Sequence, residues 1–422
     1  MIGWAGMAQA ENWMMRDGTE SKNAPAVRVF GLIQPTYQHD YSNRLEGLVG
    51  LDAAHNGEYP LSALIGPGYK SISGYYLFRV RVGARGLVDP MINYEVVLEA
   101  GANALTTQVG EEFNTELAEG SITLNHVPGA RLRLGLFKTP GSEEALRTAI
   151  DYVNFTNVTF RFINYQPVER LVGPVTPYGV PGQTSSGVRA YRDTGVQLFD
   201  AFTYGNQEVS YAVMAGNGST LNQTDDNARR AYYGRLQWSH IFPQSQGYLV
   251  ADREDLTAFV WKHNGQQEFD GASYGAVREG LGFSLLRHPV HLTVEYMRGE
   301  GMVLLTPVFR GDPLLVFPGK DNEGSGWYAD VGYFVTPHVM VELRYDVMDL
   351  LKNLAPVHQQ LRTATIGAQY YFSKNARIAF NYEVRDYSSR SLTAADGDAY
   401  HNAQRVGDSV GNRLAIQASL KF

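Results

Sequence analysis

The chain has 422 residues and a formal net charge of −7, and 44% of its residues are hydrophobic and 12% aromatic. It contains no cysteine, which excludes disulfides, thiolate catalysis and haem attachment through a CxxCH motif. The acidic balance argues against a nucleic-acid partner. The mean hydropathy of −0.25 and the lack of an apolar run of about 18 residues argue against a membrane protein built from helices.

The N-terminal residues 1–10 read MIGWAGMAQA and end in Ala8-Gln9-Ala10. Small residues in this pattern are typical of a signal-peptidase site, although the basic region that precedes such a site is missing. We interpret residues 1–10 as the remnant of a signal peptide; the alternative is a disordered N-terminus. Residues 11–25 are then a periplasmic N-terminal lead-in to a single domain that spans residues 26–422.

From Val27 onward, apolar and polar residues alternate in segments that end at turn residues. Successive side chains of a strand point to opposite faces, so each segment predicts a strand with one apolar and one polar face. The number is about sixteen, and bacterial single-chain outer-membrane barrels have an even number of strands. The predicted strands are Val27–Gln38, Gly74–Ala84, Ile92–Ala100, Ser121–His126, Arg131–Phe137, Asp193–Phe202, Glu208–Gly216, Arg230–His240, Asp255–His263, Ser273–Leu286, Val290–Arg298, Trp327–Val335, Val339–Asp349, Arg362–Phe372, Arg377–Asp386 and Asn412–Phe422.

The connections between these segments alternate in length. Tight turns such as residues 204–206 alternate with long loops such as residues 39–73. The connection at residues 241–254 is an exception, because it is long at a position where the alternation predicts a tight turn. A soluble sandwich has no reason to separate short from long connections, whereas outer-membrane barrels have short periplasmic turns and long extracellular loops. The sequence therefore predicts an all-β fold, a transmembrane antiparallel β-barrel of about 16 strands.

The longest connection, residues 138–192, follows the fifth predicted strand. Loops of this length in compact proteins are usually functional or disordered. Ser142 precedes Glu143 and Glu144, and a Ser N-cap with acidic residues in the first turn predicts a short helix. We expect an ordered loop that folds inward and constricts the barrel; the alternative is a surface lid.

The last predicted strand alternates without interruption and ends on Phe422. Its apolar face would meet lipid and its polar face a wet lumen. A terminal aromatic residue at the end of such a strand is typical of outer-membrane barrels and resembles the signal that their assembly machinery reads. We predict that Phe422 is an assembly signal.

Four motifs together resemble the phosphate-selective porin O and P family. They are LGLFKTP at residues 134–140 with the acidic pair that follows, YVNFT at residues 152–156, YRDTGVQL at residues 191–198, and RVRVGARG at residues 79–86. The resemblance covers most of the chain after Pro25. The chain departs from the family at Gly141, where the family usually has Phe, and at residues 173–187, an insertion rich in Pro, Gly and Ser.

The resemblance implies an outer-membrane porin of a Gram-negative bacterium, which would assemble as a homotrimer and pass small hydrophilic solutes by passive diffusion. Its partners would be outer-membrane lipid and small solutes or inorganic anions. In porins the loop equivalent to residues 138–192 narrows the barrel. The family name covers many members that have never been shown to pass phosphate, so phosphate is one candidate among the ions.

The alternation also predicts which charges face the lumen. The predicted lumenal basic residues outnumber the acidic ones, which favours a mild anion preference, because arginine rings favour anions and guanidinium groups bind phosphate oxygens in pairs. These basic residues are Arg79, Arg81, Arg131, Arg133, Arg344, Arg377, Arg385, Arg413 and Lys421. The alternative is that these arginines simply pair with lumenal glutamates. The predicted pore-lining, anion-binding residues are Arg79, Arg81, Arg131 and Arg133, with Arg161, Arg170 and Arg189 in the long loop able to reach the constriction. Lumenal acids would include Glu95, Glu99, Glu295, Glu342, Asp346 and Glu383.

Enzyme chemistry has no clear sequence pattern here. The ten histidines are scattered, and no Ser–His pair has a recognisable context. We therefore expect no catalytic residue, no metal site and no cofactor. Two further functions stay open: a barrel that acts as a scaffold or sheath for a partner protein, and a channel specific for an uncharged or organic solute.

Overall fold

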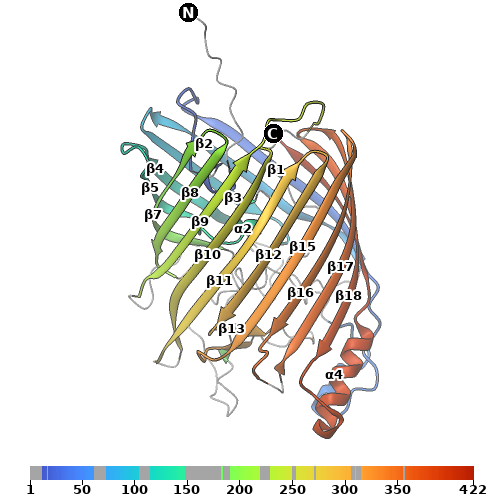
Figure 1. Cartoon of the computed structure of the whole chain (residues 1–422). Helices are drawn as coiled ribbons and strands as arrows, with labels where there is room; N and C mark the ends of the chain where they lie inside the picture. Colours follow the sequence, from blue (N-terminus) through green and yellow to red (C-terminus); the bar gives the residue numbers. More distant parts are fainter. Residues whose placement is uncertain are drawn as a thin grey trace, which may run out of the picture.

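The computed structural model describes residues 12–16, 18–60, 73–103, 115–147, 182–183, 191–218, 229–249, 253–269, 272–305, 309, 315–354 and 357–422. Sixteen strands form one closed antiparallel barrel, which confirms the predicted fold (Figure 1). The barrel strands are β1 (Arg28–Asp40), β2 (Ser73–Asp89), β3 (Ile92–Ala100), β4 (Glu116–Leu124), β5 (Arg131–Lys138), β7 (Arg192–Tyr204), β8 (Gln207–Gly216), β9 (Ala231–Ile241), β10 (Asp255–Phe269), β11 (Ala272–Arg287), β12 (Val290–Glu300), β15 (Glu323–Thr336), β16 (Val339–Leu350), β17 (Gln359–Ser373), β18 (Ala376–Ser389) and β19 (Arg413–Lys421).

The barrel closes between its first and last strands. β1 pairs antiparallel with β19, so that Leu32 lies opposite Lys421. One residue further on, the backbone N–H of Gly31 donates to Phe422 at 2.9 Å, and the N–H of Phe422 donates to Gly31 at 3.1 Å. Closure leaves the barrel without an unpaired strand edge. A sheet in lipid must be closed in this way, because lipid cannot satisfy the backbone groups of an open edge.

The lengths of the connections follow the predicted parity, except that β10 ends at Phe269 and β11 begins at Ala272 at the end where the other connections are longer. At the end of the barrel that holds the C-terminus, hairpins close with turns such as Gly205-Asn206 and Lys374-Asn375. The connection at residues 242–254 is the longer exception on this side, as predicted. Longer connections at the opposite end carry η1 (Gly50–His55), η3 (Ala394–Asp396) and α4 (Asp398–Ser409) (Figure 1). Because short turns are periplasmic in such barrels, we refer to the C-terminal end as the periplasmic end.

Burial shows that the apolar faces of the strands point outward. In β16, Val341 and Leu343 are 43% and 61% exposed, whereas the intervening Glu342 and Arg344 are each 4% exposed. A soluble sandwich buries its apolar faces, whereas these strands expose them. The arrangement is that of a barrel with lipid outside and a polar lumen. None of the described helices is long and apolar enough to cross a membrane.

Unbroken alternation in Gly74–Ala84 predicts that Tyr76 shares the outward face of Val80 and Val82. This prediction is wrong, and a β-bulge is the reason. In the pairing of β1 with β2, Gln34 lies opposite Arg79 but Pro35 lies opposite Leu77, so Phe78 is an extra residue. A bulge shifts the alternation by one position. Tyr76 therefore points into the lumen, where its hydroxyl donates to Gln38 at 3.2 Å, and does not share the outward face predicted for it.

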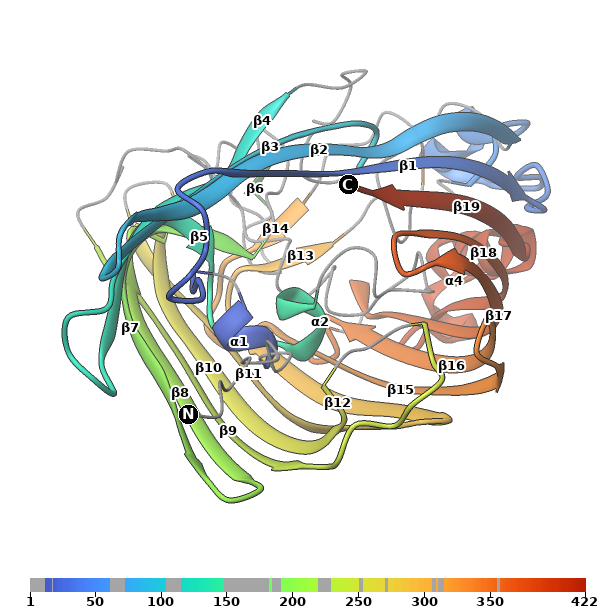
Figure 2. The same cartoon turned by 90° about the horizontal axis from the view of Figure 1, so that it is seen from above.

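Several shorter elements lie within the barrel. Figure 2 shows α1 (Trp13–Arg16) and α2 (Glu143–Leu146) inside the ring of strands. A small separate sheet joins β13 (Val303–Leu305), β14 (Leu315–Phe317) and β6 (Gly182–Gln183). β6 belongs to the loop 138–192, so this loop is hydrogen-bonded to the connection between β12 and β15. Val316 and Phe317 are buried, and Phe317 lies in a cluster with barrel side chains such as Trp261.

Candidate functional site in the barrel lumen

The start of the long loop turns inward after β5 and crosses the lumen. Its α2 helix forms at the predicted position, with Ser142 as the N-cap residue. The Ser142 hydroxyl does not cap the helix but donates to Glu295 on β12 at 2.9 Å. Glu143 accepts from Arg235 on β9 at 2.6 Å, and Glu144 accepts from Arg344 on β16 at 2.6 Å. The inward fold predicted for this loop is confirmed for its described first part.

The structure gives a reason for the glycine at position 141, where the family that the chain resembles usually has Phe. His263 on β10 is buried, and its Nε2 lies 3.1 Å from the carbonyl oxygen of Pro140. A Cβ at position 141 would lie 2.8 Å from that Nε2, closer than real side chains approach. A phenylalanine here would have to displace the histidine, whereas glycine lets the loop backbone contact His263 on β10 directly.

Arg79 and Arg81 share a single carboxylate. Arg79 Nε donates to Glu99 Oε1 at 2.8 Å, and Arg81 Nε donates to Glu99 Oε2 at 2.9 Å. The two arginine side chains are 15% and 14% exposed, while the Glu99 side chain is fully buried. Two guanidinium groups on one carboxylate leave a net positive charge at this point of the lumenal wall.

Arg131 and Arg133 differ from that pair and from each other. Arg131 forms an ion pair with Asp200 at 3.1 Å, and its side chain is 31% exposed. Arg133 is buried, donates to Ser121 at 2.9 Å and lies 3.4 Å from Glu95. The four predicted arginines therefore lie on β2 and β5, with β3 and β4 between them, and Arg133 is enclosed by its partners. Arg161, Arg170 and Arg189 lie outside the described residues.

Two arginines of this wall were missing from the predicted pore lining. Arg192, at the start of β7, donates to Glu119 at 2.8 Å, and its guanidinium lies 4.7 Å from the centre of the Tyr191 ring. Arg85 lies 3.6 Å from Glu95 and just beyond the predicted end of the second strand. Alternation continued by a few residues would have indicated Arg85. We call the set Arg79, Arg81, Arg85, Arg133, Arg192, Glu95, Glu99 and Glu119 the basic wall.

The strands β12, β15 and β16 form a wall of opposite character. Arg344 is the centre of its contacts: it lies 2.6 Å from Asp346, 3.6 Å from Asp330 and 2.6 Å from the loop residue Glu144. Its guanidinium also lies 4.2 Å from the centre of the Tyr328 ring. We call the set Glu295, Asp330, Glu342, Arg344 and Asp346 the acidic wall.

Among the residues that the structure describes, no three His, Asp or Glu side chains come together in a way that could hold a metal ion. The acidic wall instead uses its carboxylates to receive hydrogen bonds. Glu295 accepts from the Trp261 indole at 2.8 Å and from the Tyr328 hydroxyl at 2.9 Å, in addition to Ser142. The arrangement is suited to fixing the loop and to creating an electric field across the lumen.

No family model matches the sequence, and a comparison with curated proteins finds no significant match. Solved structures do resemble the fold. An anion-selective porin from Comamonas acidovorans has a TM-score of 0.54 at 13% identity, covering 94% of this chain and 98% of that one. Salmonella typhi OmpF in complex with daunomycin has a TM-score of 0.51 at 10% identity, covering 94% and 97%. A loop-deletion mutant of OmpT, an outer membrane protein of Vibrio cholerae, has a TM-score of 0.50 at 11% identity, covering 94% and 99%.

The chain has the porin fold. At these identities the likeness concerns the architecture alone. It agrees with the predicted location in the outer membrane of a Gram-negative bacterium, because closed sixteen-strand barrels with an outward apolar face are built for that membrane.

Proposed function

We propose that the protein is an outer-membrane porin that lets small hydrophilic solutes diffuse passively and mildly prefers anions. The observation that carries the proposal is the closed barrel with a polar lumen. The start of the long loop, residues 139–147, extends into this lumen and is hydrogen-bonded to the acidic wall. Opposite that loop, Arg79 and Arg81 share Glu99 and keep a net positive charge. Fixed positive charge in a narrow wet pore concentrates anions.

Phosphate is a candidate solute because guanidinium groups bind its oxygens in pairs. The resemblance to the phosphate-selective porin O and P family supports this, and so does the structural likeness to a porin named anion-selective. The same resemblance supports a homotrimer. Mass measurement of the complex in mild detergent tests the assembly, and a monomer would refute the trimer without affecting the channel.

Single-channel recording with a salt gradient tests the function. The full chain should show discrete conductance steps that reverse toward the Nernst potential of the anion. Replacing Arg79, Arg81, Arg131 and Arg133 by Gln should move the reversal potential toward the Nernst potential of the cation. Because Arg133 is buried, the double variant Arg79→Gln/Arg81→Gln is the cleaner probe. An unchanged reversal potential would assign selectivity to other residues, such as those of the long loop.

The sheath function fits the structure less well. A partner protein threaded through the barrel would need space along the lumen, and α1 and α2 both lie within the ring of strands (Figure 2). A channel for an uncharged organic solute would conduct ions without a preference that depends on Arg79 and Arg81. The same recordings therefore separate these functions, and we expect no enzymatic activity.

A further inference from the structure

Residues 12–16 and 18–20 of the N-terminal lead-in contact side chains that line the lumen. At the periplasmic end, Asn12 Nδ2 donates to Glu208 at 2.6 Å and lies 3.2 Å from the Ser210 hydroxyl, both on β8. Met14 and Met15 are buried together with Leu146 of α2 and with the barrel residues Phe199 and Ala212. The segment that enters from the periplasm thus meets the loop that enters from the other side.

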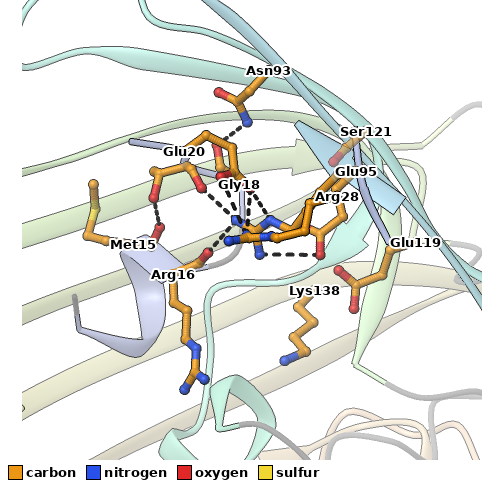
Figure 3. A network of polar contacts seen from close by, with 12 residues as sticks. Met15, Arg16, Gly18, Glu20, Arg28, Asn93, Glu95, Glu119, Ser121 and Lys138 are labelled. Carbon is orange, nitrogen blue, oxygen red and sulfur yellow. Dashed lines mark hydrogen bonds and ion pairs between the residues drawn. The ribbon is translucent and has the colours of Figure 1, made fainter. Parts of the chain in front are cut away.

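The barrel wall holds this segment by its backbone (Figure 3). Arg85 Nη2 donates to the carbonyl oxygens of Arg16 at 3.0 Å and Thr19 at 2.5 Å. Asn93 Nδ2 donates to the carbonyl oxygen of Gly18 at 2.9 Å. The Glu20 carboxylate adds an ion pair with Arg85 and another with Arg28 at 3.2 Å. Wall side chains thus satisfy three backbone carbonyls within four residues of the segment, which fixes its path along the wall.

Gly18 is required where the segment passes Arg133. Its φ is +85°, a conformation that residues with a side chain rarely adopt, and a Cβ there would lie 2.9 Å from Arg133 Cδ and Nε. Arg133 cannot easily move aside, because Ser121 and Glu95 fix its guanidinium. The wall side chains and the segment are therefore complementary in shape as well as in hydrogen bonding.

We propose that residues 12–16 and 18–20 form a second pore-narrowing element, bound at the lumenal wall by hydrogen bonds from Arg85 and Asn93 to their backbone and by the fit of Gly18 against Arg133. The inference rests on the proposed channel function. The segment reduces the cross-sectional area of the lumen at the periplasmic end. Its residues Met14 and Met15 also pack against Leu146 of α2. It also directs Arg85 toward backbone carbonyls and brings the Glu20 carboxylate to this wall, so it lowers the positive potential that a passing anion meets.

A disulfide test shows whether the segment is seated in the membrane-embedded protein. The chain has no cysteine, so the double variant Asn12→Cys/Ser210→Cys reports one contact without background. It should form a disulfide in the outer membrane, with loss of both free thiols. The matched control Asn12→Cys/Ser419→Cys, with its second position on the far side of the barrel, should keep them. Free thiols in both variants, or crosslinking in the control alone, would overturn the seating.

Conductance then tests the narrowing. A variant lacking residues 12–24 should show larger conductance steps and a reversal potential closer to the anion limit than the full chain. Arg85→Gln should give a partial version of this change, whereas Arg390→Gln on an extracellular loop should leave recordings unchanged. The oxidised double-cysteine variant should conduct like the full chain. Equal conductance with and without the segment would overturn the narrowing while the channel function stands. Absence of conductance in every form would overturn both, and the crosslink would still report the seating.

Discussion

The two walls of the lumen use arginine in different ways. On the basic wall, five guanidinium groups face three carboxylates, and Arg79 and Arg81 keep part of their surface open to the lumen. On the acidic wall, Arg344 is surrounded by carboxylates from its own wall and from the loop. An inward-facing arginine is therefore a pore cation only where guanidinium groups outnumber their acidic partners. Arg344 instead fastens the constriction loop.

Both walls depend on a closed barrel, and the seam at Phe422 is the first place to test it. Deleting Phe422 removes two backbone hydrogen bonds to Gly31 and the ring that covers this glycine. We expect a large loss of folded protein in the outer membrane, measured by immunoblot of membrane fractions. Phe372→Ala, which removes another lipid-exposed aromatic ring, is the control and should leave the level nearly unchanged. Equal levels for all three forms would mean that Phe422 is no assembly signal.

Breaking the acidic wall should cost the most stability. Arg344→Gln leaves several buried carboxylates without their cation, and breaking a buried ion pair typically costs about 3–5 kcal/mol. Urea unfolding of the detergent-solubilised barrel measures the change. Arg362→Gln is the control: its side chain is 37% exposed and 4.0 Å from Asp386, so about 0–1 kcal/mol is expected. Similar losses for both variants would contradict the fastening role of Arg344.

Much of the fold was predictable because alternation directly records which face of a strand is wet. Each predicted strand overlaps an observed one, and Ile92–Ala100 has the same bounds. Alternation does not report neighbours, so Glu99 as the shared partner of Arg79 and Arg81 was not predicted. It also could not detect the bulge at Phe78. The N-terminal segment has no periodicity, and its place in the lumen depends on tertiary contacts that only Gly18 hints at.

The basic wall should lose its bound segment when Gly18 is replaced. A residue other than glycine at positive φ costs about 1–3 kcal/mol, and Gly18→Ala adds a clash with Arg133. In the background of Asn12→Cys, the variant should increase the labelling rate by a bulky thiol reagent added from the periplasmic side. Gly57→Ala is a matched control, since Gly57 has φ +90° but open space around it. Equal labelling rates in the two variants would contradict the fit of the segment against Arg133.

Charge changes at one point of the basic wall should move selectivity in opposite directions. Glu99→Gln removes the shared carboxylate and should shift the reversal potential toward the anion limit. Arg79→Gln/Arg81→Gln should shift it toward the cation limit, because fixed charge sets the local ion concentration. Recordings in the same salt gradient compare the two variants. Shifts of the same sign would show that these changes act through pore shape rather than charge.

The most direct test of the central claim is the reversal potential of the unmodified protein at two salt concentrations. In a gradient near 0.1 M, where the Debye length is about 10 Å, conductance steps should reverse toward the chloride Nernst potential. Near 1 M, where it is about 3 Å, the preference should largely vanish, because salt screens the wall charges. Reversal toward the potassium potential at low salt, or a preference that salt does not weaken, would contradict a channel governed by the charge of its basic wall.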